Sequence, residues 1–128
     1  MYPLIRLGLA LLAFAAPLPA IAAGSTPVGQ WEVTTGESRY RVSFCGEGEK
    51  LCARLTWLRD DARTLENLAL LGNYVVRGAA PVEANTWTGT VTYDGETYDG
   101  KVTLVDTNTL RLQSCSGVFC RTFELHRL

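Results

Sequence analysis

Apolar and polar side chains alternate with a period of two through most of the sequence after residue 28. In the segment 87–93, for example, threonines at 88, 90 and 92 separate Trp87, Gly89, Val91 and Tyr93. Successive side chains of a β-strand point to opposite faces, so this pattern is typical of strands with one buried face. The alternation therefore predicts antiparallel strands that are half buried on one side.

Turn residues divide the pattern into eight candidate strands. If Asp94 and Gly95 form a two-residue hairpin loop, Val91 faces Tyr98, and inward residues stay opposite inward residues along the hairpin. Regularly spaced short strands joined by turns indicate a closed barrel or a sandwich. The expected strands lie near residues 28–35, 38–45, 51–58, 73–77, 85–93, 96–105, 109–115 and 119–127.

One segment breaks the alternation. Apolar residues recur at helical spacing within residues 60–72, where Asp60 or Asp61 can cap the first turn and Gly72 can end the last. We expect a short helix or a compact loop there. A turn is expected at residues 78–81, after a short strand.

Residues 1–22 have the composition of a secretory signal peptide. Arg6 precedes an apolar stretch that leads to the small-residue pattern Ala20-Ile21-Ala22. The apolar stretch is shorter than the roughly 20 residues that a membrane-spanning helix needs, and prolines interrupt it, so an uncleaved anchor is the weaker alternative. We predict secretion across the inner membrane to the periplasm, leaving residues 23–128 as one domain without a membrane anchor.

The charge of the expected mature chain limits its partners. It carries eleven Lys and Arg residues against thirteen Asp and Glu residues, with no run of like charge and no basic stripe. Nucleic acids and anionic membrane surfaces attract clustered basic residues, so neither is an expected partner. The sequence does not specify an oligomeric state.

All four cysteines lie in the part expected to be exported, where an oxidising compartment favours disulfides. Three pairings are possible. Strand parity places Cys45 with Cys52, and Cys115 with Cys120, on the outward faces of single hairpins, so each pair can meet without crossing the barrel. A four-residue loop at 47–50 would set the first pair directly opposite each other.

Zinc binding and redox chemistry are the alternatives for these cysteines. Six residues separate Cys45 from Cys52, which is wider than usual zinc-ligand spacing. Neither pair has the Cys-x-x-Cys spacing of a redox site. We therefore expect two structural disulfides and no metal.

Trp31 and Arg127 both fall on the inward side of the first and last expected strands. Those strands become neighbours when a barrel closes, and a guanidinium stacked on an indole can then seal one end. The combination of Gly29-x-Trp31 with an arginine on the last strand resembles the lipocalin and fatty-acid-binding superfamily. That resemblance implies that Gly29, Trp31 and Arg127 close the barrel floor without contacting ligand.

Several longer motifs carry a more specific resemblance across residues 28–127. The motifs are Gly29-Gln30-Trp31, Leu51 to Leu58, Leu70-Leu71-Gly72, Trp87-x-Gly89 leading to Tyr98, and Leu110 through both last cysteines to Arg127. Together they are similar to an exported bacterial family known as domain of unknown function 2147. The resemblance implies a small, all-β, eight-stranded antiparallel lipocalin-like barrel and no established activity.

The sequence contains no recognisable catalytic constellation. The only histidine, His126, is expected on the outward face of the last strand, where a surface role is usual. The closest carboxylates, Asp60-Asp61 and those at 47 and 49, lie in predicted loops, where caps and turns are their ordinary roles. No nucleophile motif or phosphate-binding glycine loop is present. We expect no catalytic residues, no enzyme activity and no cofactor.

Inward aromatic side chains predict a ligand pocket instead. Gly89 and Gly100 would leave space inside the barrel, and Arg121 would supply one inward charge. The alternative is that the aromatic side chains are plain core and that Arg121 meets a carboxylate such as Glu96. The candidate ligand-binding residues are Arg121, Tyr40, Trp57, Trp87, Tyr93 and Tyr98.

Two functions follow from these patterns. The first is a periplasmic carrier or sensor that binds a small, partly apolar and hydrophobic or anionic ligand inside the barrel. The alternative is an envelope interaction or inhibitor module that uses the outer face or residues 59–72. This second function predicts a barrel filled by its own side chains and an exposed apolar patch.

Overall fold

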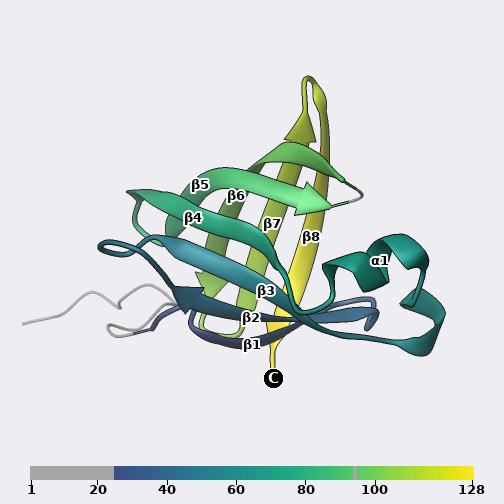
Figure 1. The fold of residues 1–128 in the computed structure, drawn as a ribbon. Coiled ribbons are helices and arrows are strands. Elements are labelled where there is room, and N and C mark those ends of the chain that lie inside the picture. Colours follow the sequence, from purple (N-terminus) through teal and green to yellow (C-terminus); the bar gives the residue numbers. More distant parts are fainter. Residues whose placement is uncertain (1–24, 94) are drawn as a thin grey trace, which may run out of the picture.

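The computed structural model describes residues 25–93 and 95–128, so the predicted signal peptide lies outside the described residues. Eight antiparallel strands form a closed barrel in which strands pair in sequence order and the last pairs with the first (Figure 1). The all-β, eight-stranded barrel expected from the sequence is confirmed. The strands are β1 (Gly29–Val33), β2 (Ser38–Phe44), β3 (Leu51–Leu58), β4 (Tyr74–Glu83), β5 (Thr86–Tyr93), β6 (Glu96–Asp106), β7 (Thr109–Ser116) and β8 (Phe119–Arg127).

The connections alternate between the two ends of the barrel. At one end lies the β3–β4 connection, which contains a 3-10 turn, η1 (Asp60–Ala62), and the helix α1 (Leu65–Leu70). We call this the helix end; the β7–β8 hairpin extends beyond the barrel on this side (Figure 1). The opposite end, which we call the Trp31 end, carries both the beginning of β1 and the C-terminus.

The helix begins later than the sequence suggests. Thr64 is its N-cap, and the Thr64 side chain accepts a hydrogen bond of 3.2 Å from the backbone N–H of Asn67. The expected cap at Asp60 or Asp61 is wrong, because these residues form the separate turn η1. Gly72 follows the helix with a φ of 83°, a conformation that suits glycine after a helix.

The fourth strand is longer than expected. Strand β4 continues through residues 78–81, where a turn was predicted, and the chain reverses at Asn85, which has a φ of 59°. The pairing of β4 with β5 shifts register between Val76 and Ala80, and Gly78 has a φ of 66°. Gly78 and Pro81 therefore lie in an irregular part of β4 and not at its end. Such residues are accommodated at β-bulges without interrupting the sheet.

Arg127 and Trp31 close the barrel where β1 meets β8. The two residues are direct partners in the β1–β8 register, and the guanidinium carbon of Arg127 lies 4.4 Å from the centre of a Trp31 ring. The indole is fully buried, with 0% of its surface exposed. The Arg127 guanidinium also donates hydrogen bonds of 2.7 to 2.8 Å to the carbonyl oxygens of Thr26, Val28 and Thr107.

The position of the Arg127 guanidinium requires a glycine at residue 29. A Cβ atom at this position would lie 2.8 Å from Nη1 of Arg127, and the φ of +149° is one that other residues rarely adopt. The indole N–H of Trp31 donates to the carbonyl oxygen of Pro27 at 2.8 Å. The three residues expected at the barrel floor therefore lie together.

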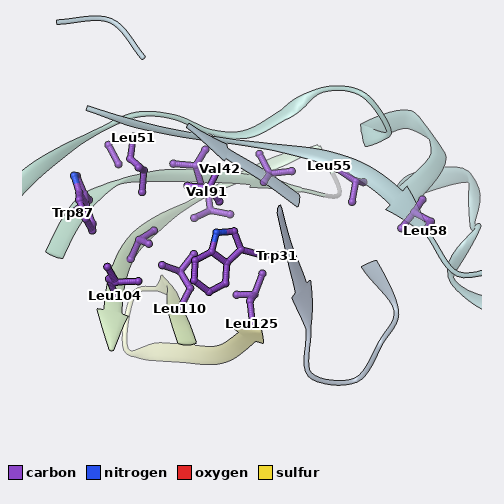
Figure 2. Close-up of a cluster of buried hydrophobic side chains, with 14 of the residues drawn as sticks. Trp31, Val42, Leu51, Leu55, Leu58, Trp87, Val91, Leu104, Leu110 and Leu125 are labelled. Atoms are coloured by element: carbon purple, nitrogen blue, oxygen red, sulfur yellow. The ribbon is translucent and has the colours of Figure 1, made fainter. Parts of the chain in front are cut away.

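Large apolar side chains fill the Trp31 end of the barrel. Figure 2 shows Trp31 surrounded by leucines and valines from several strands. Trp87 lies in this layer with 4% of its surface exposed, and its indole N–H donates to the carbonyl oxygen of Glu49 at 2.8 Å. Burial of one such side chain stabilises a fold by about 1.5–3 kcal/mol, so this layer is a major part of the core.

Both expected disulfides have bonding geometry, with Cα–Cα distances of 5.9 Å for Cys45–Cys52 and 4.0 Å for Cys115–Cys120. Cys115 lies directly opposite Cys120. Cys52 instead pairs with Ser43, because the backbone N–H of Cys45 bonds to the carbonyl of residue 50 and the loop starts one residue earlier than predicted. The expected direct opposition of Cys45 and Cys52 is therefore wrong, although the bond itself joins the same hairpin.

Replacing Arg127 by lysine should test the closure. Lysine keeps the charge but loses the planar fork that reaches three carbonyls and covers the indole, so R127K should lower the free energy of unfolding by about 2 kcal/mol. The control is R111K, because Arg111 forms an exposed ion pair with Glu124, which should be worth less than about 0.5 kcal/mol. Urea denaturation measures both, and equal losses would contradict this role for Arg127.

The two disulfides should differ in their effect on stability. Loop closure alone gives about 2 to 2.5 kcal/mol for each. Cys52 is only 8% exposed and its Sγ accepts the N–H of Gly78 at 3.2 Å, whereas Cys120 is exposed. The pair C45A/C52A should therefore cost about 1 kcal/mol more than C115A/C120A in urea denaturation, because it also removes a buried acceptor. A larger loss for the second pair would refute this assignment.

Candidate functional site

A cavity of about 460 Å³ occupies the interior of the barrel toward the helix end. Side chains from all eight strands line it, and most of them are apolar. Ligand sites in proteins commonly enclose about 300–1,000 Å³, so the volume suits one small molecule. The alternative function of an interaction module predicts a barrel filled by its own side chains. The structure instead contains this cavity. The apolar wall includes Val42, Leu55, Val91, Val102, Leu112 and Phe123.

The mouth of the cavity is polar. It is formed by the β1–β2 connection and by the segment that carries η1 and α1. Arg59 joins these two segments, because its guanidinium donates to Asp61 at 2.6 Å and to the carbonyl of Thr35 at 3.0 Å. The hydrogen bond from Arg59 lowers the pKa of the Asp61 carboxyl below its ordinary value. The polar mouth residues are Thr35, Glu37, Asp61, Thr64 and Asn67.

Tyr40 places a hydroxyl in the cavity wall. Its oxygen accepts a hydrogen bond of 3.2 Å from the hydroxyl of Ser38, which also lines the cavity. Burial is the main cause that raises the pKa of Tyr40 above 10.0, and nearby Glu37 adds to the effect. Within the described residues, the Tyr40 O–H has no acceptor of its own. The phenol is therefore a neutral donor that is available to a molecule in the cavity.

A second cavity of about 350 Å³ adjoins the first near the β7–β8 hairpin. Tyr93, Ser114 and Arg121 line both cavities. Ser114 and Arg121 are direct cross-strand partners, and Ser114 is only 4% exposed. The rings of Tyr93 and Tyr98 stack with their centres 4.8 Å apart and form one wall of this second cavity.

The structure places only some of the predicted ligand-binding residues at the cavities. Tyr40, Tyr93 and Arg121 line the main cavity, and Tyr98 lines the second cavity. Arg121 does not meet Glu96, whose carboxylate accepts a 3.5 Å hydrogen bond from the Tyr98 hydroxyl. No carboxylate within residues 25–93 and 95–128 forms an ion pair with Arg121. Trp57 and Trp87, which were also predicted to bind ligand, line neither cavity.

The expected inward position of Trp57 is wrong. The β2–β3 pairing shifts register between Arg39 and Tyr40, so that Trp57 pairs with Arg39 while Tyr40 pairs with Leu55. Beyond this bulge the faces exchange, and Leu58 rather than Trp57 is buried in the core. Trp57 instead packs against the Arg39 guanidinium, whose central carbon lies 4.2 Å from the indole centroid.

The expected role of Trp87 in the pocket is also wrong, since its ring belongs to the core at the Trp31 end. Gly89 and Gly100 do not provide ligand space either. A Cβ atom on Gly89 would lie 3.0 Å from the backbone of Ala79, and one on Gly100 would overlap a methyl group of Val91. These glycines allow the strands themselves to pack closely.

Sequence reasoning missed Ser114 as a site residue. The alternation that turns Leu110 and Leu112 inward also turns Ser114 inward. Extending the same parity by one more step would have placed a hydroxyl beside Arg121. Ser38 carries the same signal, because alternation along β2 places it on the face of Tyr40 and Val42; the extra residue of the bulge, Thr56, lies on β3.

A model of the family described as "Uncharacterized protein conserved in bacteria (DUF2147)" matches residues 29–127. The chain belongs to DUF2147. The match runs from β1 to β8, so every strand that lines the cavity is part of the DUF2147 domain. The resemblance expected from the sequence motifs is confirmed.

Two further comparisons add little beyond DUF2147. The comparison with curated proteins found no match. Among solved structures, the chain is similar to a redesigned beta barrel, with 15% identity, a TM-score of 0.47, and coverage of 79% of this chain and 90% of the other.

A metal site and a membrane-spanning helix are both absent from the part of the chain that the structure describes. That part contains no group of three or more His, Cys, Asp or Glu residues able to hold a metal ion. It also contains no helix that is long and apolar enough to cross a membrane. His126 lies exposed on β8, opposite Thr109 and Glu32 of the neighbouring strands.

The raised pKa of Tyr40 should appear in the pH dependence of stability. The unfolded chain ionises this tyrosine near pH 10.0, before the folded protein does. Its contribution is therefore complete below that pH and is lost as the pH rises through the higher pKa of the folded state. The variant Y40F should lose less stability between about pH 9 and about pH 11 than the unmodified protein.

Urea denaturation at the two pH values measures this difference. The control is Y74F, because Tyr74 is an exposed tyrosine on β4 and its removal should leave the alkaline loss in place. An unchanged alkaline loss in Y40F would show that Tyr40 is not the buried group responsible.

Proposed function

We propose that this DUF2147 protein is a periplasmic binding protein without enzyme activity, which holds one small and partly apolar molecule inside its barrel. The observation that carries the proposal is the cavity of about 460 Å³, with its apolar wall and its few polar groups. An apolar wall binds the body of a ligand by the hydrophobic effect, and isolated polar groups fix its orientation.

The arrangement of the two barrel ends supports a single entrance. At the Trp31 end, the buried indole, Trp87 and the Arg127 contacts fill the interior. At the helix end, the polar segments around Arg59 border the cavity. A ligand therefore enters and leaves at the helix end. The link from Arg59 to Thr35 and Asp61 lies at this entrance.

The periplasmic location is part of the proposal. Two disulfides indicate an oxidising compartment, and the family is described as conserved in bacteria. The predicted signal peptide at residues 1–22 gives the route. Native mass spectrometry of the protein purified from its own periplasm should reveal a retained small molecule, and removal of that molecule by organic extraction should lower the measured mass.

Filling the cavity should abolish binding. The neutral fluorescent probe N-phenyl-1-naphthylamine should bind the unmodified protein, because the probe is apolar and of suitable size. The variants A53F and L112W place extra ring atoms in the cavity, since both residues line it. Each should weaken probe binding about tenfold or more, as measured by fluorescence titration.

The matched control is T90F, because Thr90 is exposed on the outer side of β5 and its phenyl ring would lie outside the barrel. Circular dichroism checks that each variant is folded. The proposal is overturned if the unmodified protein does not bind the probe, or if both cavity variants bind it as T90F does.

A second candidate function is an envelope interaction module that uses the β3–β4 connection. The observation in its favour is the exposure of two leucines of α1, Leu65 at 82% and Leu68 at 40%. Exposed apolar side chains grouped on one element are typical of interaction surfaces. Replacement of residues 65–71 by a Gly-Ser segment should then abolish recovery of a partner in pull-down assays, and unchanged recovery would exclude this function.

A further inference from the structure

The two cavities adjoin each other. They share Tyr93, Ser114 and Arg121, so their linings meet at the β7–β8 side of the barrel. The main cavity has a mostly apolar lining, whereas the second cavity is smaller and combines aromatic rings with polar groups. A molecule that occupied both would place chemically different parts in each.

Ser114 is a buried polar group in need of a partner. It is 4% exposed and lies where the two cavities join, and within the described residues its hydroxyl has no hydrogen-bond partner. Buried hydroxyls in folded proteins are nearly always hydrogen bonded, because leaving one unpaired is costly. A polar atom supplied from within the cavity would satisfy it.

Arg121 gives that site a positive charge. It is the charged residue common to both linings, and it is the direct cross-strand partner of Ser114. Some arginines of the described chain form ion pairs with carboxylates, as Arg39 does with Glu32 and Arg111 with Glu124. Arg121 forms no such pair among the described residues, and it is an exposed residue that borders both cavities.

The acidic residues that line the main cavity do not line the second cavity. Glu37 and Asp61 line the main cavity at its mouth, and neither lines the second cavity. Asp61 is already bonded to Arg59 at 2.6 Å. Among the described residues that line the second cavity, Arg121 is therefore the one charged side chain, and the stacked rings of Tyr93 and Tyr98 bound the space beside it.

We propose that the ligand is a single-chain anionic amphiphile whose acid group lies between Arg121 and Ser114, with its apolar chain in the main cavity. This proposal rests on the proposed function of the barrel as a binding protein and adds the class and orientation of the ligand. The guanidinium donates two parallel hydrogen bonds to the acid oxygens, and the serine hydroxyl donates a third. The chain then extends past Leu112 toward Val102 and Val91.

Three ligands with the same ten-carbon chain and different head groups test the proposal: decanoate, decylamine and 1-decanol. Their dissociation constants are measured by displacement of N-phenyl-1-naphthylamine below the concentrations at which they form micelles. The unmodified protein should bind decanoate about tenfold more tightly than 1-decanol, because charge-assisted hydrogen bonds add to the same apolar contacts. Decylamine should bind most weakly.

Variants of the two head-group residues should remove this preference. R121Q should bind decanoate and 1-decanol about equally while leaving 1-decanol binding unchanged, and S114A should weaken decanoate binding about threefold. The matched control is R41Q, because Arg41 is exposed on the outer face of β2. Retained binding of the neutral probe shows that each variant keeps a folded barrel.

The outcomes separate the two proposals. If the neutral probe binds but decanoate shows no advantage, or R121Q retains the advantage, the anionic class is overturned and the binding function stands. Tighter binding of decylamine also overturns it. If neither the probe nor any of the three ligands binds, the binding function and the anionic class fall together.

Discussion

The contact between Arg127 and Trp31 is the constraint on which the rest of the barrel depends. It lies on the one strand pair that joins residues from opposite ends of the described chain, β1 with β8. Without that pair, both strands would present unpaired backbone edges to water, and an open sheet could not enclose an interior. A cation can occupy this position because it stacks on the indole and meets three carbonyl oxygens.

The interior is divided into a filled layer and an open one by the sizes of the side chains. Tryptophans at 31 and 87 take up the volume at the Trp31 end. Toward the helix end, valines and leucines on many strands leave the middle unfilled, while Tyr40 and Arg121 place polar groups along the wall. The barrel therefore has a packed layer at one end and a cavity at the other.

Much of this architecture could be predicted from the sequence, because alternation fixes the face of each residue wherever a strand is regular. The hairpin of β5 and β6 has the predicted register, with Val91 opposite Tyr98. The predictions failed where the backbone gains an extra residue. The bulge at Arg39 and Tyr40 turned Trp57 outward, and irregular pairing carried β4 through an expected turn. Bulges depend on the twist and closure of the whole barrel, which no local pattern records.

The size of the cavity could not be predicted for a similar reason. Parity indicates which side chains point inward, but it does not indicate whether they meet across the barrel. Gly89 and Gly100 illustrate this limit, since the space beside them is taken by Ala79 and Val91 rather than left open. Ser114 shows the reverse case, in which the regular pattern contained the signal and only its chemical meaning required the three-dimensional site.

The positions of the two disulfides bear on how the chain assembles. Each bond joins cysteines that are only 7 or 5 residues apart, within one hairpin. Such short covalent loops remove little of the entropy that must be lost when residues 31 and 127 meet, because that cost grows with the length of chain between them. Hairpins can therefore form and become crosslinked early, while the β1–β8 seam is a late event of folding that only non-covalent forces hold. Separation of β1 from β8 would open the circle of strands and leave both oxidised hairpins intact.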